Sequence, residues 1–180
     1  MPSVLVPLAA GAEELEAVTV IDLLRRARFE VTVAGLESGP VTCSRGTVIQ
    51  PDTPLDPVLD ATFDLIVLPG GLPGADHLRD DARVQGLLRA QAERGGFVAA
   101  ICAGPRALAA AGLLEGRRVT AYTGALDAAG VPSSGALVEV DGRLITGRGP
   151  GAAMDFALTL IEQLAGRAAR DAVEGPLLRP

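Results

Sequence analysis

The sequence predicts an α/β protein built on a doubly wound, mostly parallel sheet, and three observations support this fold class. Short apolar runs suited to β-strands alternate along the chain with longer segments of helical periodicity. Most of the short runs are apolar throughout rather than alternating, as is typical of parallel strands covered on both faces. The length of 180 residues, 48% of them hydrophobic, suits one domain with a sizeable core. We therefore expect a single domain over residues 1–180.

The strands and helices of this sheet can be placed by their patterns. Five runs predict strands: SVLVPL (3–8), FEVTVAG (29–35), DLIVLPG (64–70), FVAAI (97–101) and RRVTAY (117–122). Four segments have helical spacing: 13–27, 82–95, 103–113 and 151–165. Met154, on the last of these, shares that spacing with neighbouring apolar residues and is expected in the core.

Three segments depart from the alternation. LVEVDGRLIT (137–146) predicts a β-hairpin excursion, with Asp141 and Gly142 as the central turn residues at positive φ. GPVTCSRGTVIQPD (39–52) predicts a second antiparallel or irregular excursion between turn residues. The last fifteen residues, GRAARDAVEGPLLRP, are expected to be either a docked tail or partly disordered.

Composition and charge exclude several classes of function. No run of about 20 uninterrupted apolar residues predicts a membrane span, and the N-terminus lacks the pattern of a secretory signal, so a cytoplasmic protein is expected. A net charge of -6 and the lack of an aromatic cluster disfavour nucleic acid as the primary partner. Cys43 and Cys102 are expected to be separate thiols, because a chain of this size needs no disulfide in a reducing compartment.

Cys102 stands at an informative position, directly after the expected strand 97–101. The carboxyl ends of parallel strands are where ligands bind in an open α/β sheet. Ala103 and Gly104 are small enough for a tight turn, and Pro105 suits the first turn of a helix. A thiolate there would face unpaired N–H groups, which would lower its pKa, as in a nucleophile elbow. The alternative is that Cys102 is a small buried hydrophobic residue, as most free cysteines are.

Glu16 is expected to point inward from the helix 13–27. It shares one helical stripe with four apolar residues: Val20, Leu23, Leu24 and Ala27. A buried carboxylate without a cation tends to keep its proton, and such an acid can donate a hydrogen bond or relay a proton. The alternative is that Glu13, Glu14 and Glu16 all complement the helix dipole, which explains the inward position of Glu16 poorly.

Gly70 and Gly71 follow the expected strand 64–70 in the stretch LPGGLPGADHL. Their N–H groups are unobstructed by side chains and could form an oxyanion hole at the same edge of the sheet. The alternative is an ordinary turn. The stretch matches neither a dinucleotide nor a P-loop fingerprint, so no nucleotide cofactor is expected, and no metal site is predicted.

Three motifs taken together resemble one known family. GAEELEAV (11–18), VLPGG (67–71) and AAICAGP (99–105), in this order and at these separations, are similar to the ThiJ/PfpI superfamily, in particular the branch of the parkinsonism-associated protein deglycase. The likeness continues through PVTCSR (40–45) and GRGPG (147–151) and covers nearly the whole chain. It implies a flavodoxin-like sandwich, a homodimer and a pocket that needs no cofactor.

The resemblance also implies roles for individual residues. Cys102 matches the reactive thiol, and Glu16 its protonated partner. Gly70, Gly71 and the N–H of Ala103 match groups that stabilise oxyanions. Three arginines match those of the family's anion-binding pocket, the last approaching from the other subunit: Arg45, Arg148 and Arg26.

One departure from the family pattern concerns histidine. Where this branch often carries a histidine after the strand that follows the cysteine helix, the chain has VTAYTGAL, with Tyr122 at or beside that place. A phenol is a poor base at neutral pH. The one histidine, His77, lies in the expected loop PGADHLRD and is expected to be solvated rather than catalytic. A protease or amidase with a Cys-His pair is therefore disfavoured, and Cys43 is expected to be a packed thiol or part of a subunit contact.

Two functions remain open. The resemblance implies a glyoxalase or deglycase acting on reactive dicarbonyls or their early adducts, in which Cys102 attacks the aldehyde and Glu16 moves a proton between carbons. The alternative is a redox-responsive stress protein, in which Cys102 is oxidised to a sulfinate that Glu16 stabilises by a hydrogen bond.

Overall fold

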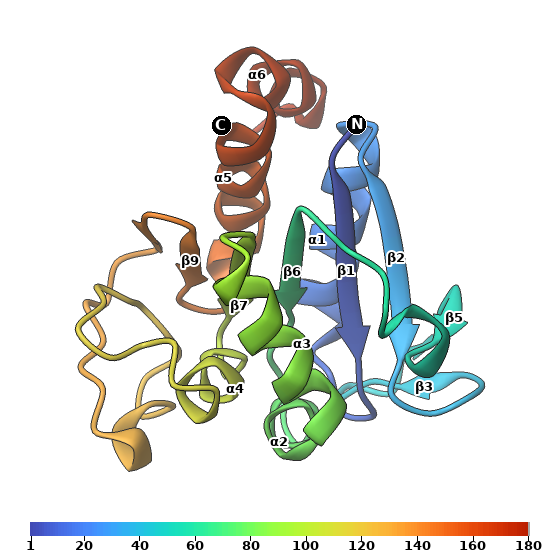
Figure 1. Ribbon diagram of the computed structural model, residues 1–180. Helices are drawn as coiled ribbons and strands as arrows, with labels where there is room; N and C mark the ends of the chain where they lie inside the picture. The colour runs from blue at the N-terminus through green and yellow to red at the C-terminus, as the bar shows by residue number, and fades with distance from the viewer. Residues whose placement is uncertain (180) are drawn as a thin grey trace.

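The computed structural model describes residues 1–179, and a seven-stranded sheet with helices on both faces lies at its centre (Figure 1). The strand order is β5-β2-β1-β6-β7-β9-β8. All neighbours are parallel except β8 and β9. The inner order β2-β1-β6-β7-β9 is the flavodoxin-like order, so the predicted fold class is confirmed.

The strands of this sheet have the following bounds: β1 Ser3–Leu8, β2 Glu30–Gly35, β5 Thr53–Pro54, β6 Leu65–Leu68, β7 Phe97–Ile101, β8 Val138–Asp141 and β9 Leu144–Gly147. One face carries α1 (Glu14–Arg26) and α5 (Ala153–Ala165), with α6 (Arg167–Glu174) packed on α5. The other face carries α2 (Gly74–Asp80), α3 (Ala82–Glu93) and α4 (Pro105–Ala110). Short 3-10 turns complete the chain: η1 Asp56–Val58, η2 Asp127–Ala129, η3 Pro150–Ala152 and η4 Gly175–Leu177.

Each central strand contributes to two cores because successive side chains point to opposite faces. On β7, Val98 and Ala100 join the cluster under α2, α3 and α4, whereas Ala99 and Ile101 join the cluster under α1 and α5. Both sets are buried. This explains why the strand sequences are apolar throughout, and it fixes the turns after β1, β6 and β7 at one edge of the sheet.

The prediction of a strand at 117–122 was wrong. The segment makes one isolated bridge, between Val119 and Ser133. The place beside β7 belongs to β9, and Thr120 N–H donates to the hydroxyl of Thr146 on that strand rather than to a backbone ladder. The segment therefore runs against the sheet as an irregular connection.

The hairpin at 137–146 is confirmed, but its turn differs from the expected one. Asp141 pairs with Leu144, so the central residues are Gly142 and Arg143, and Gly142 has φ 60° whereas Arg143 has no positive φ. A glycine at the first central position suits this kind of tight turn. The hairpin is no excursion, since β9 joins the main sheet. The second expected excursion forms a separate antiparallel pair, β3 (Val41–Thr42) and β4 (Val48–Ile49).

Two predictions about helices need correction. The expected loop PGADHLRD forms α2, which ends where the Asp81 side chain accepts N–H groups from the first turn of α3. The helix expected at 103–113 is shorter, since α4 begins at Pro105 and ends at Ala110. Met154 is 44% exposed rather than buried, because it lies off the core-facing stripe of α5, which includes Ala153, Phe156 and Ala157.

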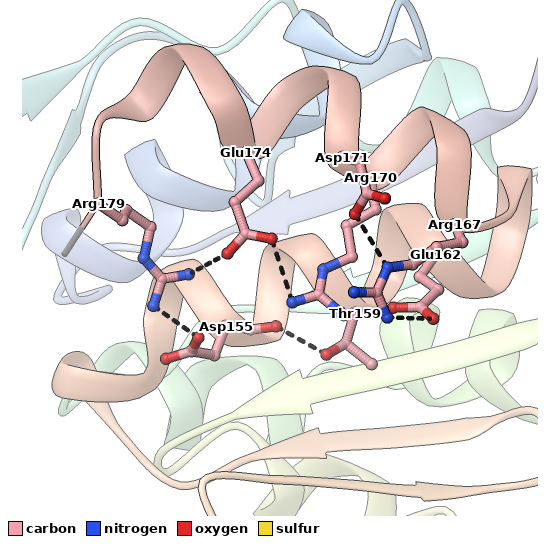
Figure 2. A network of polar contacts seen from close by, with 8 residues as sticks. All are labelled: Asp155, Thr159, Glu162, Arg167, Arg170, Asp171, Glu174 and Arg179. Carbon is pink, nitrogen blue, oxygen red and sulfur yellow. Dashed lines mark hydrogen bonds and ion pairs between the residues drawn. The ribbon is translucent and has the colours of Figure 1, made fainter.

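The tail is docked over the described residues, which decides between the two alternatives of the sequence. Figure 2 shows the polar network that fixes it to α5. Arg179 bonds to Asp155 at 2.7 Å and to Glu174 at 3.2 Å. Arg170 bonds to Glu162 at 2.7 Å. The α6 helix and both chain ends lie at the end of the sheet opposite the one where the arrows of β1 and β2 finish (Figure 1).

Candidate functional site

Three turns at the carboxyl edge of the sheet bring the predicted site residues together. Glu16 lies in the first turn of α1 after β1, Gly70 and Gly71 follow β6, and Cys102 follows β7. A Cβ atom built on Gly70 would lie 2.6 Å from the Cys102 Cβ and 2.6 Å from Glu16 Oε2. The three residues are therefore in direct contact, and only glycine fits between the thiol and the carboxyl group.

Cys102 occupies a strained backbone position. Its φ of 64° is in the left-handed region, which non-glycine residues rarely adopt and which is common at functional sites. Its N–H donates to the Gly147 carbonyl at 2.9 Å, and its carbonyl accepts the Tyr122 N–H at 2.9 Å. The side chain is only 8% exposed. The strand, the tight turn and the following proline therefore form the elbow that the sequence predicted.

Glu16 is fully buried among the apolar residues of α1, as its helical stripe predicted. Oε2 accepts the Gly70 N–H at 2.8 Å. Oε1 is buried and has no partner with hydrogen-bond geometry among the described residues. Burial raises the pKa of Glu16 to about 7, against the lowering effects of the Cys102 thiol and the Gly70 N–H; the Glu13 charge raises it further. The carboxyl group is therefore poised between its two protonation states near neutral pH.

The pKa of Cys102 lies in the opposite direction from the sequence expectation. While Glu16 is ionised, burial, followed by the charge and hydrogen bond of its carboxylate, raises this pKa to about 12. The N–H groups of Gly71 and Ala103 lower it but do not outweigh those causes. A thiolate and a carboxylate in contact repel, so Cys102 and Glu16 share one negative charge over a wide pH range.

The expected oxyanion donors differ in availability. The Gly70 N–H donates to Glu16 Oε2 at 2.8 Å, so in this structure it faces the carboxyl group, and its role as an oxyanion donor stays a prediction. The Gly71 and Ala103 N–H groups are the ones that act on the Cys102 sulfur. Gly71 has φ 86°, and a Cβ there would collide with the backbone N of Glu13. Glycine is therefore required at both positions, for different reasons.

The predicted anion-binding residues are spread more widely. Tyr122 lies close to the thiol through its backbone, while its ring is 55% exposed and lies against Gly149. Arg148 is exposed after β9 and donates to the Gly135 carbonyl. Arg45 is exposed in the β3–β4 turn, 3.9 Å from Glu13. The structure thus places Tyr122 beside Cys102 through a backbone hydrogen bond, whereas the arginine side chains bond to other groups.

Arg26 lies away from Cys102 within this chain. It pairs with Asp22 at 2.6 Å in the last turn of α1, ten residues after Glu16. That separation corresponds to about 15 Å along a helix. Any role of Arg26 at a thiol therefore requires a second copy of the chain, as the family resemblance implies.

Glu13 and Glu14 do more than the helix-dipole reading predicted. Glu13 N–H donates to the Gly70 carbonyl at 2.9 Å, and its carboxylate accepts the Ser44 hydroxyl at 3.0 Å. Glu14 accepts the N–H groups of Arg45 and Thr47, and these backbone hydrogen bonds hold the pKa of Glu14 at about 2 although burial raises it. No sequence pattern revealed that these acids anchor the β3–β4 turn beside the site.

His77 and Cys43 lie outside the Cys102 cluster. His77 is exposed on α2, with Nδ1 3.0 Å from the Ala10 carbonyl oxygen. Cys43 is buried in the β3–β4 turn, and burial together with Glu14 and Glu13 raises its pKa. Within residues 1–179 no cluster of acidic, histidine or cysteine side chains is arranged to hold a metal. Nor does any helix in this range have the length and apolar character to span a membrane.

Comparison with known proteins gives consistent matches. A family model described as the DJ-1/PfpI family matches residues 2–163. The Parkinson disease protein 7 homolog of Danio rerio is 47% identical over 97% of this chain and 95% of its own length. The glutathione-independent glyoxalase DJR-1.2 of Caenorhabditis elegans is 38% identical over 92% of this chain and 90% of its own.

A solved structure agrees with the fold. The structure of oxidized Toxoplasma gondii DJ-1 superposes with a TM-score of 0.95 at 39% identity, covering 99% of this chain and 98% of that one. The likeness therefore extends over the sheet, both helical layers and the docked tail.

Proposed function

This chain belongs to the DJ-1/PfpI family, and we propose that it is a cysteine-dependent glyoxalase or deglycase that acts on reactive dicarbonyls or their early adducts in stress defence. The observation that carries the proposal is the contact between the Cys102 thiol and the buried Glu16 carboxyl, whose pKa is about 7. The name of the Caenorhabditis elegans relative, a glyoxalase, supports the same chemistry.

In the reactive form, the shared charge lies on sulfur and the proton on Glu16. That arrangement leaves the thiolate with the N–H groups of Gly71 and Ala103, and it gives the partnerless Oε1 a proton to donate. It also removes the carboxylate charge that raises the pKa of Cys102. An acid with a pKa near the working pH is effective at both giving and taking a proton.

The first step on methylglyoxal is addition of the thiolate to the aldehyde carbon. The C–S bond forms, the carbonyl electron pair moves to oxygen, and the Gly71 and Ala103 N–H groups stabilise that oxyanion. The Glu16 proton then passes to the oxyanion, giving a hemithioacetal and a Glu16 carboxylate. No cofactor enters this step.

The second step moves hydrogen between carbons without an external oxidant. The Glu16 carboxylate removes the proton from the former aldehyde carbon and returns it to the neighbouring ketone carbon, while the hemithioacetal hydroxyl proton passes to the former ketone oxygen. One carbon is thereby oxidised to a thioester and the other reduced to an alcohol. Water then cleaves the thioester, releasing lactate and a proton and restoring the shared monoanion. The atoms of methylglyoxal and one water molecule together equal those of lactic acid.

Conversion of methylglyoxal to lactate tests this proposal. We expect the purified chain to produce lactate and Cys102→Ser to reduce the turnover to that of buffer. Cys43→Ser is the matched control and should retain activity. A chain with intact thiols that produces no lactate above buffer would overturn the enzyme proposal.

The second candidate is a redox-responsive protein. The similar Toxoplasma gondii DJ-1 structure is described as oxidized, and this favours the candidate. The Cys102 thiolate would react with one peroxide to give sulfenate and water, and with a second to give sulfinate and water. Protonated Glu16 would donate its Oε1 proton to the sulfinate. Peroxide should therefore add two oxygens to Cys102 before it oxidises Cys43. Glu16→Gln should allow further oxidation of Cys102 to the sulfonate. The same series of oxidation products in the parent chain and in Glu16→Gln would contradict this role.

We also propose a cytoplasmic homodimer with a small aldehyde or dicarbonyl as its substrate. Exposed apolar side chains lie on the adjoining helices α1 and α5 and on β4: Leu15, Val18, Val48 and Met154. A second copy covering these side chains would bury them and would bring its Arg26 toward the Cys102 pocket of the first copy, as the family resemblance implies. Sedimentation of the chain and of Val18→Asp tests the dimer, which the charged variant should dissociate.

A further inference from the structure

The strained elbow at Cys102 depends on neighbours that hold its peptide groups in place. A non-glycine residue keeps a φ of 64° only where the surrounding contacts fix its backbone, because this conformation is costly. Two hydrogen bonds do this, one to Gly147 and one from Tyr122. Gly147 is the last residue of β9 and is fixed by the sheet. Tyr122 belongs to the irregular segment after α4, so the second hydrogen bond depends on what fixes that segment.

The turn that carries Tyr122 is fixed in two ways. On its inner side, Ala121, Ala125 and Leu126 are buried in the core under α4. On its polar side, Ala125 N–H donates to the Tyr122 carbonyl at 2.9 Å, and the Ala125 carbonyl accepts the Arg106 Nε–H at 3.1 Å. Two side chains therefore hold the polar groups of this segment: the Ser133 hydroxyl accepts the Ala121 N–H at 3.1 Å before Tyr122, and Arg106 holds the turn after it.

Arg106 is itself anchored from the other side. Its Nη1 donates to Asp76 Oδ1 at 3.0 Å, and Asp76 belongs to α2, which lies beside α4 at this end of the sheet (Figure 1). Both side chains are about two-thirds shielded from solvent, with 28% and 32% exposure. The guanidinium group offers its donors in a fixed planar fork, so one side chain can bond to α2 and to the turn at the same time.

We propose that Arg106 is a positioning residue for the Cys102 thiol. It acts through Ala125 and Tyr122 on the Cys102 carbonyl, and so keeps the sulfur in line with the N–H groups of Gly71 and Ala103. The Arg106 side chain bonds to Ala125 and Asp76 rather than to the thiol or Glu16, and no feature of the sequence motif AGPRAL had assigned it a role. The inference rests on Cys102 being the reactive thiol, as proposed above.

The test is the pH profile of Cys102 alkylation by iodoacetamide, with the two cysteines distinguished by mass spectrometry. In Arg106→Ala the elbow should relax, so the thiolate loses alignment with its N–H donors while access to the sulfur increases. We expect the apparent pKa of Cys102 to rise by about one unit, which is about tenfold less thiolate at a given pH, and the rate plateau at high pH to rise. A purely structural role would not produce both changes together.

Arg79→Ala is the matched control, because Arg79 also bonds to Asp76, at 2.9 Å, but contacts Asp80 rather than the Tyr122 turn. Its profile should follow that of the parent chain. Arg106→Lys should leave the pKa raised, since a single ammonium group cannot bond to both Asp76 and Ala125 in the same way. Alkylation of the buried Cys43 reports general unfolding. If Cys43 becomes reactive in Arg106→Ala, the comparison is made with Arg106→Lys instead.

Profiles of Arg106→Ala and Arg106→Lys that coincide with that of Arg79→Ala would overturn the positioning role. A parent chain whose Cys102 is not alkylated at any pH would contradict the reactive-thiol assignment, and the inference with it. Reactive Cys102 without lactate production would count against the glyoxalase proposal alone. The three results are therefore distinguishable.

Discussion

The two cysteines of this chain show how similar burial can lead to different chemistry. Cys102 and Cys43 are 8% and 4% exposed, and both have acidic neighbours that help to raise their pKa. The acid beside Cys102 is Glu16, which is buried and has a pKa of about 7. The acid beside Cys43 is Glu14, which backbone N–H groups hold ionised with a pKa of about 2.

This difference between Glu16 and Glu14 shows that a neighbouring carboxyl group can either suppress or support a thiolate. Glu14 stays charged across the neutral range and only disfavours a second charge on Cys43. Glu16 can take up the proton and leave the single charge of the pair to sulfur. Cys102 also has a positive φ, and the N–H groups of Gly71 and Ala103 lower its pKa, whereas burial and the two acids only raise the pKa of Cys43.

The largest expected effect comes from filling the space between Cys102 and Glu16. Gly70→Ala places a Cβ atom 2.6 Å from both the Cys102 Cβ and Glu16 Oε2. Such overpacking costs about 1–3 kcal/mol of unfolding free energy, and we expect Cys102 to lose its reactivity while Cys43 is unchanged. Urea unfolding and cysteine labelling measure the two effects.

Gly86→Ala on α3 is the matched control, because no atom lies within 4 Å of its added Cβ. It should be neutral or stabilising by up to about 1 kcal/mol, as expected for glycine in a helix. A Gly70→Ala chain with parent stability and parent labelling rates would contradict the close packing of the site.

The next effect is on the pH dependence of stability. The pKa of Glu16 is raised from 4.5 to about 7, so the folded state holds a proton that the unfolded state has lost. Stability from this group is complete below about pH 4.5 and falls as pH rises to about 7, by roughly 3 kcal/mol. Glu16→Gln should flatten this decline.

Unfolding midpoints in urea at several pH values between these limits measure the decline. The comparison is between slopes, so a uniform loss of stability in Glu16→Gln does not obscure it. Equal slopes in the parent and the variant would show that Glu16 keeps an ordinary pKa.

The smallest effect is expected at the other acid. The pKa of Glu14 is lowered from 4.5 to about 2 by the N–H groups of its own backbone, Arg45 and Thr47, with burial opposing them. Its contribution is present above about pH 4.5 and is lost as pH falls toward 2. Glu14→Gln should therefore reduce stability slightly at neutral pH and little at pH 2, with Cys102 labelling unchanged; a large change in Cys102 labelling would mean that the two cysteine regions are coupled.

Much of the fold was predictable because it depends on local patterns. Uniformly apolar strands such as 97–101 and the helical stripe of Glu16 follow from burial on both faces of a sheet. The segment 117–122 was misassigned because its apolar residues pack in the core without joining the sheet. The helix α2 was missed because the proline and glycines before it are typical of turns.

The residues of the site were predictable from the sequence, but their hydrogen bonds and pKa values were not. Strand ends and small residues located Cys102, Gly70 and Gly71, and the helical stripe located Glu16. That Glu16 occupies the Gly70 N–H, or that burial outweighs the helix start in setting the pKa of Cys102, depends on tertiary contacts 30 to 90 residues apart in sequence. The roles of Glu14 and Arg106 are of the same kind, since their partners lie on other elements.

The most direct test of the central claim is the ultraviolet absorbance of the thiolate as a function of pH, measured in a Cys43→Ala chain. If Glu16 holds the proton and sulfur the charge, thiolate absorbance should appear as the pair loses its first proton, near pH 7. Absorbance that stays absent until the pH approaches 12 would place the charge on Glu16 and contradict the claim.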